Sequence, residues 1–268
     1  MSSDAHVKRE SGVEILNLSL SRAKLIRLLH RGKGRSRERA YLAEGKRLLE
    51  ELSQSPARVR FLFGVEEEAG WLARHFPEES ISVVDEPGAL FATEQAQGVG
   101  AIVEMPDTIT PHDLAERGGP LLFLDGLADP GNVGTILRTA EWFGLGGVMF
   151  GRGSIDPFNP KVVRASMGAI FRLPVIEEIT PHDIITLGLP LFALDAHGTS
   201  LLGREALPER GVYVIGGEAH GVSPELLERA EPIAIMGSGR GESLNAAIAT
   251  AILLYELRRG LYLPPLTP

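Results

Sequence analysis

The chain has 268 residues, and its 27 Lys and Arg against 35 Asp and Glu give a net charge of −8, while 44% of the residues are hydrophobic. This composition is typical of a soluble globular protein, and the length suits one large domain or two smaller ones. Because the sequence has no cysteine, disulfides, thiolate zinc sites, iron–sulfur clusters and cysteine nucleophiles are excluded. We therefore expect an ordinary cytoplasmic protein.

Residues 1–20 carry charges throughout and do not resemble a secretion signal. The longest uncharged run, Ser243 to Tyr255, is well short of the roughly 18 to 20 residues that span a bilayer. The seven histidines show no H-E-x-x-H pattern. We expect neither a membrane span nor a metal.

The charge is unevenly distributed along the chain. Ten basic and two acidic residues lie between Arg22 and Arg47, a local charge of +8, so the remainder carries −16. A basic block on an acidic protein is typical of a surface that binds nucleic-acid phosphates. The alternative is a solvated helix face that serves solubility alone.

The first hundred residues read as a small α/β unit. The apolar spacing predicts a helix over Leu16 to Leu29, a basic loop over His30 to Ser36, and a second helix running from Tyr41 to Leu52. Short strands are expected at Phe61 to Val65, Ile81 to Asp85 and Val99 to Glu104.

A stretch with three prolines and two glycines, residues 105–120, marks a domain boundary near residue 106. Beyond it, strand-like runs alternate with helical patterns, which predicts a parallel sheet covered on both faces. We expect strands at 120–125, 147–151, 191–195, 212–216 and 232–236. The predicted organisation is a front domain at 1–105, a linker at 106–118 and a second α/β domain at 119–268.

Three strand–loop–helix units stand out in the second domain. In the first, Asp129-Pro130-Gly131 is a turn, Asn132 is a good N-cap, and Arg138 falls away from the apolar stripe of the helix. On spacing alone, Arg138 could equally form a surface pair with Glu141.

The second unit runs from a strand into Gly216-Gly217-Glu218 and Gly221, and Ser223 then caps a helix. The third has a strand ending at Met236, a glycine-rich loop, and a helix beginning near Leu244, capped by Ser243 and apolar almost all round, which predicts that it is buried. The simplest reading gives the glycines loop geometry and lets Asn245 bond the loop backbone.

Glycine-rich loops at the carboxyl ends of parallel strands are where open α/β sheets bind ligands. The dinucleotide fingerprint, the P-loop and the G-x-S-x-G nucleophile elbow are all absent from the sequence. The residues alone thus predict a ligand-binding α/β domain behind a basic, RNA-facing front domain.

Together, the three units resemble the motifs of the SpoU (TrmH-like) RNA ribose 2′-O-methyltransferases of the SPOUT class. LDGLADPGNVGTILRTAEWFG is similar to the first motif, IGGEAHGVSPEL to the second and IMGSGRGESLNAAIATAI to the third, while KVVRASMGAIFRLP follows the family pattern between them. YLAEGKRLLEEL and ATEQAQGVGAIVEM are similar to a ribosomal-protein-like RNA-binding domain.

The resemblance implies a deep trefoil knot, a homodimer formed through the C-terminal domain, and S-adenosyl-L-methionine as the cofactor. It implies methylation of a ribose 2′-hydroxyl in RNA. Large-subunit ribosomal RNA is the expected substrate, and transfer RNA is the second choice. The implied cofactor-binding residues are Gly216, Gly217, Glu218, Ile235, Met236, Gly237, Ser243 and Leu244.

The residues that the resemblance places at the catalytic centre are Arg138, Asn132, Glu218, Ser243 and Asn245. The resemblance implies that Arg138 reaches from one subunit into the pocket of its partner. Since arginine keeps its proton, we expect Arg138 to bind a phosphate and orient the hydroxyl there. The expected RNA-binding residues are Arg31, Lys33, Arg35, Arg37, Arg39, Lys46 and Arg164. The alternative function is a non-catalytic RNA-binding or ribosome-assembly protein with a vestigial cofactor pocket.

Overall fold

The computed structural model describes residues 8–10, 13–85, 88, 90, 91, 97–204, 206–238 and 243–262. The chain divides into two compact units, Met1–Asp107 with Phe158–Arg172, and Thr108–Pro157 with Leu173–Pro268. The first change of unit follows Asp107, next to the boundary expected near residue 106. The chain therefore passes between the units three times, because Phe158–Arg172 groups with the first unit although its neighbours in sequence group with the second.

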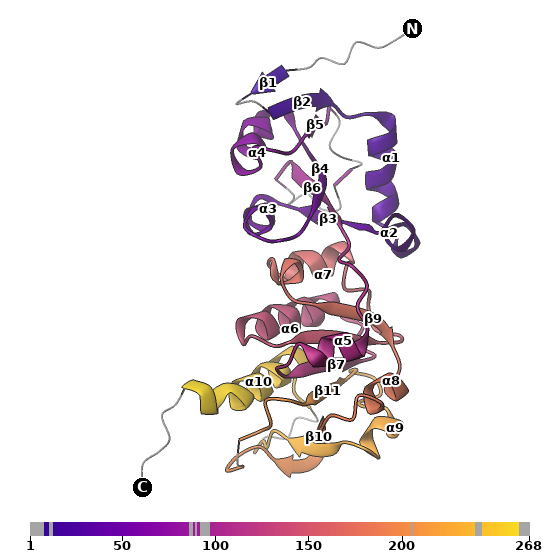
Figure 1. Cartoon of the computed structure of the whole chain (residues 1–268), viewed down its shortest axis with the longest axis vertical. Coiled ribbons are helices and arrows are strands. Elements are labelled where there is room, and N and C mark those ends of the chain that lie inside the picture. The colour runs from indigo at the N-terminus through magenta and orange to yellow at the C-terminus, as the bar shows by residue number, and fades with distance from the viewer. Residues whose placement is uncertain are drawn as a thin grey trace. The chain divides into compact units, whose positions relative to one another are not determined.

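The first unit is built on a mixed six-stranded sheet with the order β1-β2-β5-β4-β6-β3 (Figure 1). Its strands are β1 (Lys8–Glu10), β2 (Val13–Asn17), β3 (Ala40–Glu44), β4 (Val59–Gly64), β5 (Ile81–Val83) and β6 (Val99–Glu104). Its helices are α1 (Leu20–Leu29), α2 (Gly32–Glu38), α3 (Lys46–Ser53), η1 (Glu66–Glu68), α4 (Ala69–His75), α7 (Pro160–Ala165) and η4 (Ala169–Phe171).

The helix expected from Tyr41 to Leu52 is wrong in its first half. Residues 40–44 form β3, which pairs antiparallel with β6, and all five are buried. A short apolar run buried on both faces has the same composition in a strand and in a helix, so spacing does not separate the two. Gly45, with φ of 101°, then turns the chain into α3.

The loop expected from His30 to Ser36 is also wrong, because Gly32–Glu38 form α2. A Cβ on Gly34 would collide with the backbone of Leu28 in α1. This glycine therefore permits a close contact between α1 and α2, a role that the sequence pattern does not distinguish from that of a glycine in a loop.

The segment Phe158–Arg172, which belongs to the first unit although it lies far along the sequence, packs on β3. The ring of Tyr41 lies 4.8 Å from that of Phe158 and 6.4 Å from that of Phe171, measured between centroids. Arg172 forms an ion pair of 3.0 Å with Glu51 of α3. This piece of the sequence therefore completes the core of the first unit.

The second unit confirms the expected parallel sheet. Its six strands have the order β12-β10-β11-β7-β8-β9, and every pair is parallel. They are β7 (Leu121–Asp125), β8 (Gly147–Gly151), β9 (Val175–Ile179), β10 (Leu191–Ser200), β11 (Val212–Gly216) and β12 (Glu231–Ala234). The helices are α5 (Pro111–Glu116), which lies within the expected linker, α6 (Pro130–Trp142), α8 (Pro181–Ile185), α9 (Pro224–Leu227) and α10 (Ala246–Tyr262).

The apolar sequence of the last helix predicts that it is buried on all sides, and this prediction is wrong. Leu253, Leu254 and Leu257 are buried, and α10 packs beside α6 (Figure 1). Ile248 and Tyr255, however, are 55% and 59% exposed. α10 thus leaves one apolar face open to solvent. Across the described ranges, no helix combines the length and the apolar character that crossing a membrane requires.

Candidate active site

The carboxyl ends of β7 and β11 meet at one edge of the second sheet, where backbone contacts join the loops that follow. The amide of Gly217 donates to the carbonyl of Asp125 (2.8 Å), and the amide of Ser223 donates to the carboxylate of Asp125 (2.7 Å). Asp125, the last residue of β7, was not selected from the sequence. Its signal there was a lone acid at the end of an apolar strand, directly before Gly126.

The glycines of the second motif are required by close backbone packing. A Cβ on Gly216 would collide with the backbone of Gly221 and Val222, and one on Gly217 would collide with the Gly126 carbonyl. Gly221 has a φ of 65°, which favours glycine. The loop-geometry reading of these glycines is therefore confirmed, and the Gly217 amide and carbonyl are both used in holding the loops together.

The N-terminus of α6 positions Asn132. The carboxylate of Asp129 accepts a hydrogen bond of 2.7 Å from the Asn132 amide, so Asp129 is the N-cap and Asn132 lies in the first turn. The expected cap at Asn132 is therefore wrong by three residues. The Asn132 side chain therefore does not cap the helix and can form hydrogen bonds with other groups.

Hydrogen bonds connect one side chain from each of the three motifs. Asn132 Nδ2 donates to Glu218 Oε1 (2.7 Å), and Asn245 Nδ2 donates to Asn132 Oδ1 (2.8 Å). The Asn245 Oδ1 atom accepts from the amides of Ala247 and Ile248 at the start of α10. Asn245 therefore caps α10 and also joins this network, and the backbone that it bonds is the start of the helix and not the loop that the simplest reading expected.

Two of the expected catalytic residues lie outside the Asn132–Glu218–Asn245 network. Arg138 is exposed on α6, nearly two turns beyond Asn132, and within the described part of the chain it has no hydrogen bond or ion pair. Ser243 is exposed in the segment before α10, and Asn245 takes the capping position that was expected for Ser243. The structure thus brings together three of the five residues.

The residues expected to hold S-adenosyl-L-methionine follow β11 and β12 at this edge. Met236 and Leu244 are apolar and 64% and 50% exposed, and a Cβ on Gly237 would have no neighbour within 4 Å. Exposed apolar side chains, accessible loop backbone and the Glu218 carboxylate suit a ligand that combines an aromatic base, polar groups and a positive charge. The residues present fit this cofactor.

The basic residues of the first unit have different surroundings. Arg31, Lys33 and Arg37 are exposed, but Arg35 is 2% exposed and donates to the Leu29 carbonyl (2.8 Å). The expectation that Arg35 contacts RNA therefore does not fit, because its guanidinium lies in the protein interior.

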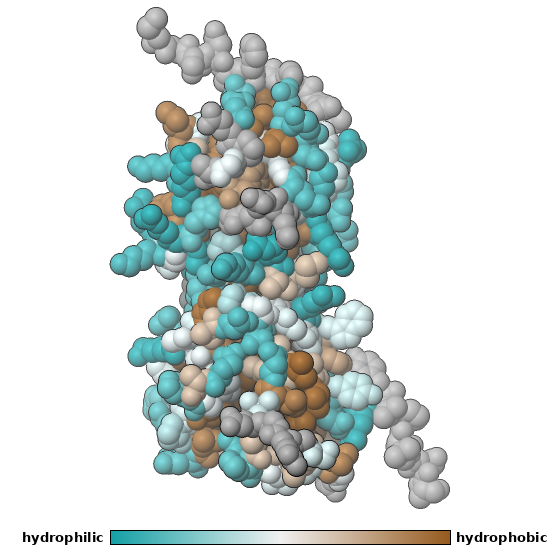
Figure 2. All heavy atoms as spheres, turned by 180° about the vertical axis from the view of Figure 1, so that it is seen from behind, coloured by the Kyte–Doolittle hydropathy of each residue, from teal (hydrophilic) through white to brown (hydrophobic). Residues whose placement is uncertain are grey.

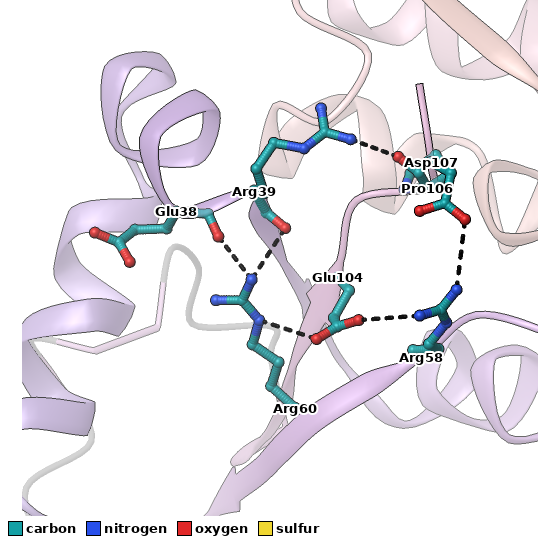
Figure 3. A network of polar contacts seen from close by, with 7 residues as sticks. All are labelled: Glu38, Arg39, Arg58, Arg60, Glu104, Pro106 and Asp107. Atoms are coloured by element: carbon teal, nitrogen blue, oxygen red, sulfur yellow. Dashed lines mark hydrogen bonds and ion pairs between the residues drawn. The ribbon is translucent and has the colours of Figure 1, made fainter. Parts of the chain in front are cut away.

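Arg39, Lys46 and Arg164 are also engaged or enclosed. Arg39 donates to the Pro106 carbonyl (2.6 Å) within a polar cluster that includes Arg58, Arg60 and Glu104 (Figure 3). Lys46 pairs with Glu68 (2.7 Å), and the Nη1 atom of Arg164 is buried without a hydrogen-bond partner. Lys46 is thus paired and Arg164 partly enclosed, whereas Arg39 is exposed and, among the described residues, forms no ion pair.

One hollow of the structure lies away from these residues. It has a volume of about 460 Å³ and is lined by the end of α3, the start of β4 and Phe76, all in the first unit. No site residue borders it. The described chain also contains no cluster of three His, Asp or Glu side chains that could hold a metal ion.

A parallel six-stranded sheet and a polar network drawn from three motifs at its carboxyl edge define an α/β domain of the ligand-binding kind. The model of the SpoU rRNA methylase family matches residues 120–255, and the chain belongs to this family. It is an RNA methyltransferase that uses S-adenosyl-L-methionine.

Individual relatives match nearly the whole chain. It is 32% identical over 243 residues to the 23S rRNA (guanosine(2553)-2′-O)-methyltransferase RlmP of Bacillus subtilis, covering 86% of this chain and 93% of that protein. The structure of an AdoMet-bound rRNA methyltransferase from Sinorhizobium meliloti matches with a TM-score of 0.79 at 28% identity, over 94% of this chain and 99% of that one. The SpoU methyltransferase AviRb from Streptomyces viridochromogenes matches with a TM-score of 0.76 at 26% identity, over 89% and 96%.

Proposed function

We propose that this enzyme transfers the methyl group of S-adenosyl-L-methionine to a ribose 2′-hydroxyl of large-subunit ribosomal RNA. The Asn132–Glu218–Asn245 network carries the proposal, because it unites the polar residues of all three motifs at the ligand-binding edge of the sheet. The similarity to RlmP, named for 2′-O-methylation of 23S rRNA, supports the substrate. The cofactor, when bound, supplies an activated methyl group.

The protein's own groups then have to hold the ribose in place. The Asn132 amide is fixed at both its oxygen and its nitrogen, so it keeps Glu218 and the start of α10 in one arrangement. Glu218 uses one carboxylate oxygen in this network and keeps the other for a ligand. Positioning a nucleophile in this way removes much of the entropic barrier to reaction.

Arg138 serves as the group that binds the RNA phosphate next to the reactive ribose. Its guanidinium stays charged at any physiological pH, so it orients the hydroxyl and does not remove its proton. Its exposure on α6 leaves it available to a site other than its own.

A homodimer would supply that other site. The exposed face of α6 and α10 carries large hydrophobic side chains: Trp142 (80% exposed), Ile248 (55%), Ile252 (37%) and Tyr255 (59%). Figure 2 shows brown side chains gathered on the α10 side of this unit. A second copy is the occupant we infer, because Arg138 lies one turn from Trp142 and would be carried into the interface. The knot implied by the family resemblance would be formed by the loops after β11 and β12.

The decisive experiment measures methyl transfer from labelled cofactor to total RNA, with the Arg138→Ala enzyme as control. We expect label in large-subunit ribosomal RNA, at a ribose, and a loss of at least about 100-fold in the control. Label in protein, in small molecules or on a base would refute the substrate. Calorimetry with the cofactor tests the non-catalytic alternative, which predicts no binding.

A further inference from the structure

Five exposed cations lie on two neighbouring helices of the first unit or, in the case of Arg31, at the N-cap between them, and we call them the α1–α2 basic surface: Lys24, Arg27, Arg31, Lys33 and Arg37. Lys24 and Arg27 are three residues apart on α1, while Ala23, Ile26 and Leu29 on its other face are buried. Lys33 and Arg37 are four residues apart on α2, which packs on α1. Residues at these spacings share one face of a helix.

The charges of this surface are not neutralised by the protein. α1 contains no acidic residue, and in the part of the chain that the structure describes no carboxylate lies within 4 Å of Lys24, Arg27, Arg31 or Lys33. Arg37 forms an ion pair of 3.0 Å with Glu38, but its side chain is 76% exposed, and such pairs contribute little. Like charges grouped in this way repel one another until an anionic partner binds.

Other arginines of the same unit, in contrast, form contacts within the protein. Arg22 donates to Ser82 (2.6 Å) and lies over the Phe61 ring, Arg35 is buried, and Arg60 donates to the Glu38 carbonyl (2.7 Å) as Figure 3 shows. The fold therefore uses these side chains for its own stability. The five cations of the α1–α2 basic surface are left for a ligand.

The surface lacks what single-stranded nucleic acid needs. Neither LSRAKLIRLL of α1 nor GKGRSRE of α2 contains an aromatic residue, and the ring of His30 between them is bonded to the Leu90 carbonyl (3.1 Å). Proteins that hold single strands stack the bases on aromatic rings, whereas paired RNA is bound through its phosphates and its shape.

We propose that the α1–α2 basic surface binds the phosphate backbone of a paired RNA stem, independently of its sequence. The inference rests on the proposed function and adds the kind of RNA structure that the substrate must contain. Phosphate contacts of this type fix orientation and affinity, and they leave the choice of nucleotide to the second unit.

The test compares the triple variant Lys24→Gln/Arg27→Gln/Arg31→Gln with a control that loses the same charge, Arg74→Gln/Arg210→Gln/Arg229→Gln. All six side chains are exposed. The probes are an RNA hairpin with a paired stem and a single strand of equal length that cannot pair, titrated between about 50 and 200 mM salt. Equal melting temperatures of the wild type, the triple variant and the control establish that they fold alike. If the triple variant does not fold, the three single substitutions are tested in its place.

We expect the wild type and the control to prefer the hairpin. The triple variant should bind the hairpin at least about tenfold more weakly, with the slope of log affinity against log salt reduced by about 2 to 3. Equal hairpin affinity of the triple variant and the control would overturn the proposal, as would equal wild-type affinity for the two probes. Absence of methyl transfer by the wild type, in contrast, would refute the proposed function whatever the binding result.

Discussion

At the scale of single residues, Asn132 has the central position in the active site. Its amide nitrogen donates to Glu218 and its amide oxygen accepts from Asn245, so one side chain holds two loops that lie far apart in the sequence. An aspartate at 132 could accept from Asn245 but would repel Glu218. The residue type is therefore explained by the need for a donor and an acceptor at one point.

Replacing Arg138 with lysine tests the role assigned to its guanidinium. We expect kcat to fall about 100-fold or more, because a lysine cannot reproduce a planar two-point contact with a phosphate. Cofactor affinity should be unchanged, since Arg138 lies outside the Asn132–Glu218–Asn245 network. Single-turnover methyl transfer and calorimetry measure the two quantities, and wild-type turnover would show the assignment to be wrong.

At the scale of elements, the helix starts of the second unit are set by local hydrogen bonds. α5 and α8 both begin with a capping box, in which Thr110 pairs with Asp113 and Thr180 with Asp183. Bonds from the hydroxyl and the amide of Thr180 hold the pKa of Asp183 below its ordinary value. Each box fixes where a short helix starts, because it satisfies amide groups that have no partner within the helix.

The lowered pKa of Asp183 makes this helix start sensitive to acid. When folding lowers the pKa of a carboxyl group, its carboxylate form stabilises the protein at pH values above the pKa of the unfolded chain, about 3.9. This contribution is lost as the pH falls through the pKa of the folded state. We expect Asp183→Asn to lower the urea midpoint at pH 7, and the difference from wild type to shrink at about pH 3. Urea titrations at both pH values measure it, and a difference that does not change with pH would contradict the assignment.

At the scale of the whole molecule, the exposed apolar face of α6 and α10 is the feature that a single chain leaves unexplained. Trp142 and Tyr255 are 80% and 59% exposed although both are large, and Ile248 is 55% exposed on the same helix as Tyr255. Patches of this kind on soluble proteins mark sites of association. Arg138 is exposed on α6 one helical turn before Trp142.

Charge placed on this face should separate the proposed dimer. We expect Ile248→Asp/Ile252→Asp to sediment as a monomer at concentrations where the wild type is a dimer, because a carboxylate is costly to bury in an interface. Leu202→Asp, at a side chain that is 85% exposed elsewhere in the same unit, should leave the dimer intact. A monomeric wild type or a dimeric double variant would contradict the interface.

A mixing experiment then tests whether Arg138 acts across the interface. Arg138→Ala and Glu218→Ala enzymes should each be inactive alone. Mixed dimers that combine them contain one intact site if Arg138 serves the partner's pocket, so activity should return. No recovery after exchange of subunits would place Arg138 in the pocket of its own chain.

The sequence by itself determined the alternation of strands and helices in the second unit, the glycines of its loops, and the residue types at the site. These follow from local rules: apolar runs predict buried strands, and turn residues mark where they end. The first unit was harder, because β3 owes its conformation to a strand distant in sequence and α2 depends on close packing against the preceding helix. β3 pairs with β6, and Gly34 fits against α1.

Only the tertiary structure decided which polar residues work together and which basic residues are free. Asn132, Glu218 and Asn245 meet because β7 and β11 end side by side and the start of α10 lies at the same edge, an arrangement that spacing along the chain does not contain. In the same way, Arg35 and Arg37 are two residues apart in one basic run, yet the first is buried and the second exposed. A count of charges along the sequence does not say which side chains face solvent. The packing of α2 against α1 decides this.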